Sequence, residues 1–182
     1  MRNILILGHG PNPKPKIRGV KITTLDMVKY PSIDVKWNLE KLPLPFKKDE
    51  FDEVWAYHII EHISKEKYDK LMEEIHRITK NGGLIKINVP FFAFFTAFHA
   101  DHKNIFTYTS FNKFEPSHPL HKEKKVAFKI QKRKIIFGVN KYTKVFNPIV
   151  NPMINSFPLF YCRFLCWILP SEELQFELKT IK

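Results

Sequence analysis

A strand–helix–strand unit in the first half of the chain is the feature that most restricts its fold. Residues 53–57 form a short apolar-rich run typical of a buried strand. From Tyr68 to Ile78, apolar residues recur at helical spacing with Lys and Glu between them, which predicts a helix with one apolar face. The Asn-Gly-Gly at 81–83 predicts the end of this helix, and residues 84–89 alternate as a strand closed by proline. A strand, a helix and a strand in this order predict two parallel strands in an α/β sheet.

Further strands are predicted on both sides of this unit. Their positions are 3–7, 21–25, 34–37, 126–139 and 174–181. A chain of 182 residues fits one domain. We therefore expect residues 1–182 to form a single domain. In it, residues 3–114 would make a ligand-binding core, and residues 115–182 would add a basic strand, an apolar helical segment and the final strand.

The strongly apolar segment at 145–169 lies between the last two predicted strands. Four of its residues oppose a regular membrane helix: Pro148, Pro152, Pro158 and Arg163. A helix docked on the sheet, at about 159–169, is the preferred interpretation. Cys162 and Cys166 are the only cysteines, and their spacing suits neighbouring helical turns better than a disulfide framework.

The turn after the first strand limits which ligand the sheet can bind. Gly8-His9-Gly10 allows backbone to approach a ligand closely, because glycine has no Cβ. Three prolines follow within five residues, at 11, 13 and 15, and remove the N–H donors and the helix start that a dinucleotide pyrophosphate needs. The pattern favours a nucleoside without phosphates that carries an amino-acid carboxylate. S-adenosylmethionine is such a ligand.

An acidic residue follows the second predicted strand. Asp26 lies where a carboxylate accepts hydrogen bonds from two ribose hydroxyls in sheets of this kind. A turn-forming aspartate is the alternative interpretation of the same residue.

Several segments, taken in order, resemble the type 11 group of class I methyltransferases. They are Leu7-Gly8-His9-Gly10-Pro11-Asn12-Pro13, Leu25-Asp26, Trp37-Asn38-Leu39, Pro43-Leu44-Pro45-Phe46, Phe51-Asp52-Glu53-Val54, His58-Ile59-Ile60-Glu61-His62-Ile63, the run from Glu73 to Gly83, and the run from Asp101 to Thr107. The resemblance covers roughly residues 3–114, and beyond that only the strand pattern fits. It implies a Rossmann-like, mostly parallel sheet of order 3-2-1-4-5-7-6 with the last strand antiparallel and helices on both faces.

The resemblance also implies roles for individual residues around S-adenosylmethionine. Gly8 and Gly10 would line the methionine moiety, with His9 where the family commonly has a cysteine or a small residue. Asp26 would bind the ribose and Met27 the face of the adenine. The adenine would be bordered by two further residues, Asn38 and Leu39. The family usually has aspartate in place of this asparagine, whose amide keeps an acceptor and adds donors.

Residues after the fourth predicted strand should lie near the transferred methyl group. Tyr57 and His58 occupy this position at the carboxyl edge of the sheet, where open α/β sheets bind ligands. Displacement at a sulfonium needs alignment of donor and acceptor and no catalytic triad. A base would help a hydroxyl or amine acceptor. The candidates are His58, His62, His99, Asp101 and His102, with His102 preferred.

Each of these residues also has a structural interpretation. His58 could pack or cap a helix, and His102 could bond backbone while Asp101 caps a turn. The His99-Ala100-Asp101-His102 spacing matches no common metal site and shows no fourth ligand, so we predict no metal. Five phenylalanines after the fifth strand either pack as core, which is the default, or wall an acceptor pocket or stack on bases: Phe91, Phe92, Phe94, Phe95 and Phe98.

The charge of the chain indicates which classes of partner it is expected to bind. The net charge of +12 favours an anionic partner. Basic residues concentrate in a block from Lys122 to Lys144, which is the best electrostatic footprint for nucleic acid and is otherwise a solvated strand face. The apolar run at the N-terminus is only four residues long, too short for a signal peptide, so we expect a cytoplasmic protein with no transmembrane segment.

Four functions remain open at this level. The preferred one is methyl transfer to an unidentified acceptor, with a small molecule, lipid or sugar favoured. Nucleic acid is the second acceptor class, and a non-enzymatic binding protein on the same fold is the third interpretation. Peripheral membrane contact through residues 157–169 is the least favoured.

Overall fold

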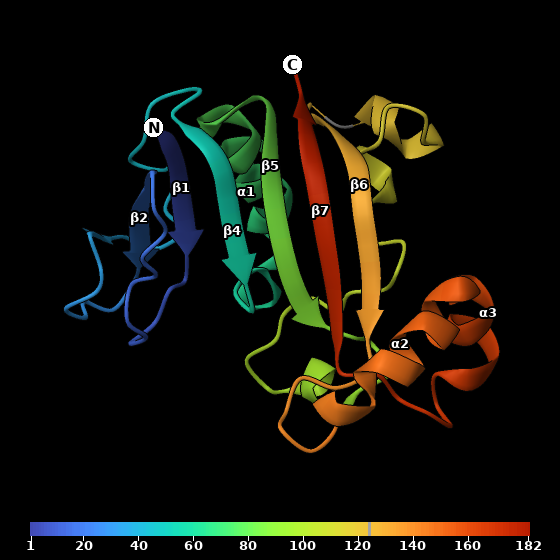
Figure 1. The fold of residues 1–182 in the computed structure, drawn as a ribbon. Helices are drawn as coiled ribbons and strands as arrows, with labels where there is room; N and C mark the ends of the chain where they lie inside the picture. Colours follow the sequence, from blue (N-terminus) through green and yellow to red (C-terminus); the bar gives the residue numbers. More distant parts are fainter. Residues whose placement is uncertain (124) are drawn as a thin grey trace.

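Seven strands form one sheet in the order β3-β2-β1-β4-β5-β7-β6 (Figure 1). The structure is a computed structural model that describes residues 1–123 and 125–182. The strands are β1 (Arg2–Leu7), β2 (Val20–Asp26), β3 (Val35–Lys36), β4 (Phe51–Tyr57), β5 (Thr79–Pro90), β6 (Ala127–Ile136) and β7 (Glu173–Ile181). The strands from β1 to β5 pair in parallel, and β7 is antiparallel to both neighbours. The predicted order and the antiparallel last strand are confirmed.

The predicted apolar stripe packs helix α1 (Lys65–Ile78) onto the middle of the sheet. Its buried side chains are Tyr68, Leu71, Met72, Ile75 and Ile78. They belong to one core cluster with the buried residues of β4 and β5. Because these residues lie three or four apart, they share one face, and burying each aliphatic side chain contributes about 1.5–3 kcal/mol. This contact holds α1 against the two parallel strands that it connects.

The helix ends earlier than its glycines suggested. Residue Ile78 is the last of α1, and Thr79 already begins β5. Gly82, with φ of 75°, therefore lies inside β5, at the point where the pairing with β4 shifts register. The expected glycine C-cap is wrong, because Gly82 adopts its left-handed conformation at an irregularity within β5.

Helices are distributed unequally about this sheet. Helix α1 lies behind β4 and β5 in Figure 1, whereas no described helix crosses the face turned to the viewer. On that face a small cluster of Ile4, Ile6 and Ile22 is buried. The proline-containing loop at 8–19 connects β1 to β2 without a helix and lies partly over this cluster.

Helix α2 (Asn147–Ser156) docks on the edge strand through asparagines. The side-chain oxygens of Asn147, Asn151 and Asn155 accept hydrogen bonds of 2.8–2.9 Å from the backbone N–H groups of Gly138, Phe137 and Ile135. Two of these amides also donate back to backbone carbonyls of the same segment. The asparagines occur every fourth residue, so one face of the helix covers the free backbone groups at the end of β6.

The chain after α2 is helical in short pieces. Helix α3 (Pro158–Phe160) runs directly into a π-helical turn, η6 (Tyr161–Leu165). The predicted helix at 159–169 is therefore partly present, and α2 was missed because its two prolines oppose a helix. Cys162 and Cys166 are free thiols, as expected. Among the described residues, no helix combines the length and the hydropathy needed to span a membrane.

The remaining turns connect these elements. They are η1 (Ile60–His62), η2 (Phe95–Phe98), η3 (Asn112–Phe114), η4 (Pro119–Glu123) and η5 (Lys144–Phe146). The first of them, η1, follows β4 at the carboxyl edge of the sheet. The second, η2, follows β5 at the same edge, so both turns contribute to the region described below.

Truncating the centre of the helix–sheet contact should destabilise the protein strongly. Ile75 is fully buried in α1, so Ile75→Ala removes apolar contact and leaves a cavity. We expect a loss of about 2–5 kcal/mol in the free energy of unfolding, measured by urea denaturation. Lys70→Ala on the exposed face of α1 is the control and should change it by less than about 0.5 kcal/mol. Equal effects of the two variants would contradict this packing.

Candidate functional site

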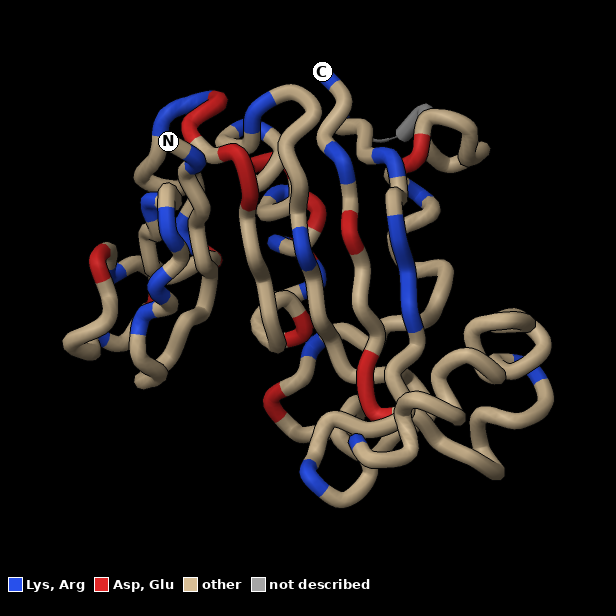
Figure 2. The backbone as a smooth tube through the Cα atoms, in the orientation of Figure 1, with Lys and Arg blue, Asp and Glu red and all other residues tan. Residues whose placement is uncertain are grey.

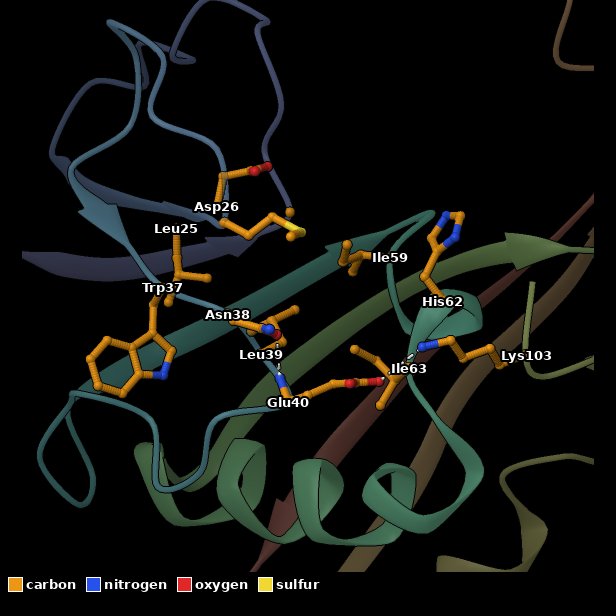
Figure 3. A pocket seen from close by; sticks show the side chains of 12 residues that line it. Leu25, Asp26, Trp37, Asn38, Leu39, Glu40, Ile59, His62, Ile63 and Lys103 are labelled. Carbon is orange, nitrogen blue, oxygen red and sulfur yellow. Dashed lines mark hydrogen bonds and ion pairs between the residues drawn. The ribbon is translucent and has the colours of Figure 1, made fainter. Parts of the chain in front are cut away.

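The first cavity at the carboxyl edge of the sheet gathers most of the residues predicted to bind the cofactor. Its volume is about 200 Å³. Five of the predicted residues line it: Gly8, Asp26, Met27, Asn38 and Leu39. Figure 3 shows that these side chains come from the ends of the first strands, and that Ile59 and His62 face them from the turn after β4.

The glycine turn is held close to the neighbouring turn. Gly8 has φ of 62°, and a Cβ at this position would lie 2.4 Å from the Ile59 side chain. Its N–H donates to the carbonyl oxygen of Leu25 at 2.9 Å. Gly8 therefore needs both the left-handed backbone and the missing side chain. Gly10, with φ of 66°, needs only the backbone freedom, because the space beside it is open.

Asp26 organises the loop that borders this cavity. One carboxylate oxygen accepts the N–H of Gly10 at 2.9 Å, and the other accepts the N–H of Val28 at 2.9 Å. Each oxygen has a second lone pair, so the carboxylate is still able to accept hydrogen bonds from a ligand. The turn-forming and the ligand-binding interpretations of Asp26 are thus compatible.

Asn38 uses its acceptor within the protein. Its side-chain oxygen accepts the N–H of Glu40 at 2.9 Å, forming a local turn. The exposed amide nitrogen keeps two donors. An aspartate at the same position would offer a ligand only acceptors, so the substitution reverses the polarity of the group facing the cavity.

An ion pair borders the far side of the first cavity. Glu40 lies 3.2 Å from the Lys103 ammonium, and its carboxylate accepts the N–H of Ser64 at 2.7 Å. This N–H and the lysine hold the pKa of Glu40 below its ordinary value. Sequence reasoning missed this pair. Its two members are 63 residues apart, and neither occurs in a pattern that points to the other.

A second cavity, of about 450 Å³, lies beside the first. It is lined by all four histidines proposed as bases, with acids and phenylalanines around them. The residues that line it are His58, Glu61, His62, Pro90, Phe94, Phe95, Thr96, His99, His102, Val139, Asn140 and Glu172. His62 lines both cavities. The second cavity therefore continues from the first at this histidine.

His58 lies between two buried carboxylates. Its Nε2 is 2.7 Å from Glu173, and its Nδ1 is 3.4 Å from Glu61. The hydrogen bonds to Glu173 and then Glu61 raise the pKa of His58 to about 9. The imidazole is therefore cationic at neutral pH. His58 is a hydrogen-bond donor to these acids and a poor base, which argues against the general-base role considered for it.

Two adjacent glutamates at the start of β7 support this cavity, and sequence reasoning missed both. Glu173 also accepts from Asn88 at 3.2 Å, and Glu172 accepts from the N–H of Val139 and the hydroxyl of Thr143 at 2.8 Å each. Both glutamates are buried. Buried acids are uncommon unless paired, but the sequence shows only that two acids begin a strand.

His102 has a buried ring nitrogen, Nδ1, that makes no hydrogen bond with the described residues. Its ring packs edge-on against His62, with 4.7 Å between centroids. His62 in turn lies 3.2 Å from the Asp101 carboxylate. The four histidines named as candidate bases thus line one cavity, and Asp101 contacts one of them.

Two overlapping groups of side chains have the spacing of metal ligands. One comprises Glu61, His62 and His102, and the other comprises His99, Asp101 and His102. Each offers three ligands, and in the first group His58 already faces the carboxylate of Glu61. The absence of a metal therefore stays a prediction.

The phenylalanines after β5 divide between core and cavity. Phe91 is fully buried in the main core. Phe94 and Phe95 line the second cavity, and Phe95 is 69% exposed. Phe92 is half-buried against the core, whereas Phe98 is exposed. The default interpretation as core is thus right for Phe91, and the pocket-wall interpretation fits Phe94 and Phe95.

The other predicted cofactor residues lie outside the first cavity's lining. Gly10 is joined to it through Asp26, and the Nε2 of His9 is buried without a partner in the described part of the chain. Tyr57 stacks on Trp55, with 5.8 Å between centroids, on the sheet face opposite α1. It is not among the residues that line either cavity. Burial raises the pKa of Tyr57 to about 12.

The basic block is less uniform than its sequence. Lys132 pairs with Glu177 at 3.2 Å, and Arg133 stacks on Tyr108 and donates to Asn112 at 2.9 Å. These two residues therefore serve local structure. Residue 124 of the block lies outside the described residues, and the side chains of Lys122 and Glu123 are not described.

Comparisons with known proteins agree with this architecture. Residues 19–87 match the family model of a methyltransferase domain. Three solved structures share the fold with TM-scores of 0.54–0.59. They are the [4+2]-cyclase SpnF (12% identity, 99% of this chain and 74% of that chain), a SAM-dependent methyltransferase from Archaeoglobus fulgidus (14%, 98% and 86%) and phosphoethanolamine N-methyltransferase 2 from Haemonchus contortus in complex with S-adenosyl-L-methionine (13%, 100% and 49%). No match is found among curated proteins.

The sheet order defines the class I methyltransferase fold. The matched domain lies inside the predicted ligand-binding core and ends within β5. The chain therefore has the class I methyltransferase fold, and its residues 19–87 are similar to the methyltransferase domain that this family model describes.

The charge of His58 should be directly measurable. NMR titration of its ring is expected to give a pKa near 9, and Glu173→Gln should move it toward 6.5, the ordinary histidine value. Because the pKa is raised in the folded state, the stability from this contact is complete below about pH 6.5 and is lost as the pH rises toward 9. His118, outside both cavities, serves as an internal control. A His58 pKa near 6.5 in the unmodified protein would contradict the ion pair.

Proposed function

We propose that the protein transfers a methyl group from S-adenosylmethionine to a hydroxyl or amine on a partly apolar acceptor. The observation that carries the proposal is the pair of adjoining cavities that share His62. One has the features expected of a nucleoside site, and the other holds polar groups suited to an acceptor. Methyl transfer requires such adjacency, because donor and acceptor must be aligned for displacement.

The first cavity fits the cofactor on chemical grounds. The backbone at Gly8, the acceptors of Asp26 and the donors of Asn38 match a methionine chain, a ribose and an adenine in turn. No phosphate cradle is built here, since prolines 11, 13 and 15 follow the glycine turn. S-adenosylmethionine would supply a methyl group on a sulfonium, from which a neutral thioether departs as a good leaving group. The residues of the chain bind it and orient it toward His62.

The second cavity favours an acceptor with both polar and apolar parts. Phe94, Phe95 and Val139 supply apolar wall, while the histidines and Glu61 supply polar groups, and His62 also lines the first cavity. The carboxylate of Glu61 is buried; one oxygen lies 3.4 Å from the His58 imidazolium, and the other accepts no hydrogen bond from the described residues. A hydroxyl or an amine would donate to such an acceptor. His102 is the preferred base for removing the proton of the accepting group.

The cofactor site can be tested without knowing the acceptor. Asp26→Ala removes a charged acceptor, and a hydrogen bond to a charged group is worth about 1.5–3 kcal/mol, so affinity for S-adenosylmethionine should fall tenfold or more. Isothermal titration calorimetry measures this. Glu66→Ala, on the exposed start of α1, is the control and should bind like the unmodified protein. Absence of binding by the unmodified protein at millimolar ligand would refute the proposed function.

The base can be tested by separating binding from turnover. His102→Gln should leave S-adenosylmethionine affinity unchanged and lower turnover by about 10²–10⁴-fold, the range typical of general-base catalysis. Release of S-adenosylhomocysteine over a panel of hydroxyl and amine acceptors measures turnover. If His102 acts as a base, the acidic limb of the pH–rate profile disappears in the variant. His118→Gln is the control, and an unchanged rate in His102→Gln would exclude the role.

Nucleic acid is the less supported acceptor class. The basic block that favoured it contains Lys132 and Arg133, both engaged in local contacts. A non-enzymatic protein is also less supported, because both cavities are present side by side. The fold alone would not exclude it.

A further inference from the structure

The C-terminal helices expose a large apolar surface. We define this apolar surface as the exposed apolar side chains between Val145 and Leu169. Phe157 is 73% exposed, Trp167 65% and Ile168 81%, and both Ile149 and Met153 on α2 are exposed as well. Single exposed apolar residues are ordinary, but a contiguous patch of this kind marks an interaction site.

The docking of α2 explains why these side chains face outward. Its asparagine face is turned to β6 and held by three pairs of partners, so the helix cannot rotate without breaking them. Ile149 and Met153 each lie two residues from these asparagines, which places them off the docked face. A soluble surface helix normally turns its apolar side inward. The outward side of α2 is therefore a fixed property of the fold.

An apolar groove runs between α2 and the following helical turns. Its volume is about 310 Å³, and it is lined by Met153, Ile154, Phe157, Phe160, Tyr161, Leu165, Ile168 and Leu169. The hydroxyl of Tyr161, the one polar side-chain group in this lining, is bonded to the Leu169 carbonyl and to Ser171. The groove thus offers no free polar group to orient a hydrophilic ligand, and its character suits a hydrocarbon chain.

The charge around the apolar surface has one sign. From residue 124 to residue 171 the sequence contains nine Lys or Arg and no Asp or Glu. Lys141, Lys144 and Arg163 are exposed within or next to the apolar surface. Figure 2 shows no acidic residue on the α2–α3 region, whereas both signs alternate at the opposite end of the sheet. Apolar side chains flanked by exposed cations, with the adjacent acids Glu172 and Glu173 buried, complement an anionic lipid interface.

The apolar surface lies at the end of the molecule that holds the acceptor cavity. Figure 1 shows α2 and α3 beyond the carboxyl end of β6, the edge at which β4 and β5 also end. Val139 and Asn140 line the second cavity and lead into η5 and α2. A flat partner seated on the apolar surface would thus lie near the entrance to the acceptor cavity.

We propose that the apolar surface docks the protein on an anionic lipid bilayer, with Trp167 and its apolar neighbours inserted at the interface and Lys141, Lys144 and Arg163 on the headgroups. This docking would bring the acceptor cavity to the membrane, and only this consequence for the acceptor rests on the proposed function. A second copy of the chain is a poorer occupant. A two-fold contact through this surface would bring the same three cations of each copy together.

Vesicle co-sedimentation tests the insertion. The unmodified protein should bind vesicles of equal parts phosphatidylcholine and phosphatidylglycerol, and Trp167→Ser combined with Ile168→Ser should weaken binding at least tenfold. Ile105→Ser combined with Leu120→Ser removes two apolar side chains of about 51% exposure elsewhere and should have no effect. Equal losses in both double variants would overturn the proposal.

A separate variant tests whether the cations beside the apolar surface contribute to vesicle binding. Lys141→Gln, Lys144→Gln and Arg163→Gln together should lower affinity for anionic vesicles by about fivefold per charge, on the order of a hundredfold in total. Lys65→Gln, Lys67→Gln and Lys70→Gln on the exposed side of α1 remove the same charge and should have a much smaller effect. Binding to pure phosphatidylcholine that equals binding to the mixture would overturn an anionic partner.

Two parallel measurements keep the interpretation unambiguous. Titration of each variant with S-adenosylmethionine reports an intact fold, so lost vesicle binding with unchanged cofactor affinity supports the docking surface. Vesicle binding by a protein that fails to bind the cofactor would refute the proposed function and leave the docking surface standing. Sedimentation equilibrium without lipid should give a monomer. A dimer abolished by the Trp167 and Ile168 changes, without vesicle binding, would overturn the bilayer in favour of a second copy.

Discussion

The cationic His58, held between Glu173 and Glu61, is the contact on which the arrangement of the active end depends. It joins the end of β4 to the start of β7, which are adjacent neither in sequence nor in the sheet, since β5 lies between them. The backbone of His58 adopts φ of 50°, an uncommon conformation for a non-glycine residue, and its N–H donates to the carbonyl of Asn88. Two buried carboxylates and a strained turn are all costly alone, and the shared imidazolium offsets these costs together. The polar wall of the second cavity follows from this contact.

Much of the sheet was predictable, because its signals are local. The stripe from Tyr68 to Ile78 and the alternation after it are read within a few residues, and they predict a parallel pair. The glycine turn and Asp26 were also predictable as neighbours, since parallel strands end at one edge. By contrast, Glu173 and the Lys103–Glu40 pair act through contacts across 115 and 63 residues. Periodicity carries no information at such separations, so these residues were missed.

The asparagines of α2 show a different reason for failure. Prolines 148 and 152 oppose a helix, but the first lies in the opening turn, where its missing N–H costs nothing. The asparagines of the helix then bond to backbone groups at the end of β6 and just after it. Intrinsic helix propensity does not include such tertiary contacts. A prediction that assumes apolar residues face the core cannot detect an apolar helix side that faces solvent. Tertiary hydrogen bonds thus decided both the existence and the orientation of α2.

The helix-free turn after β1 and the apolar surface after β6 lie at the same end of the molecule. A phosphate-bearing cofactor would need the helix start that the prolines after Gly8 remove, so the first cavity favours a ligand whose charge lies elsewhere. The second cavity mixes buried acids with Phe94 and Phe95, and it is bordered by the segment that leads to α2. A freely soluble, fully polar acceptor would gain nothing from these phenylalanines. An amphiphilic acceptor would use both the polar and the apolar parts of this cavity, and a membrane is where such a molecule is concentrated.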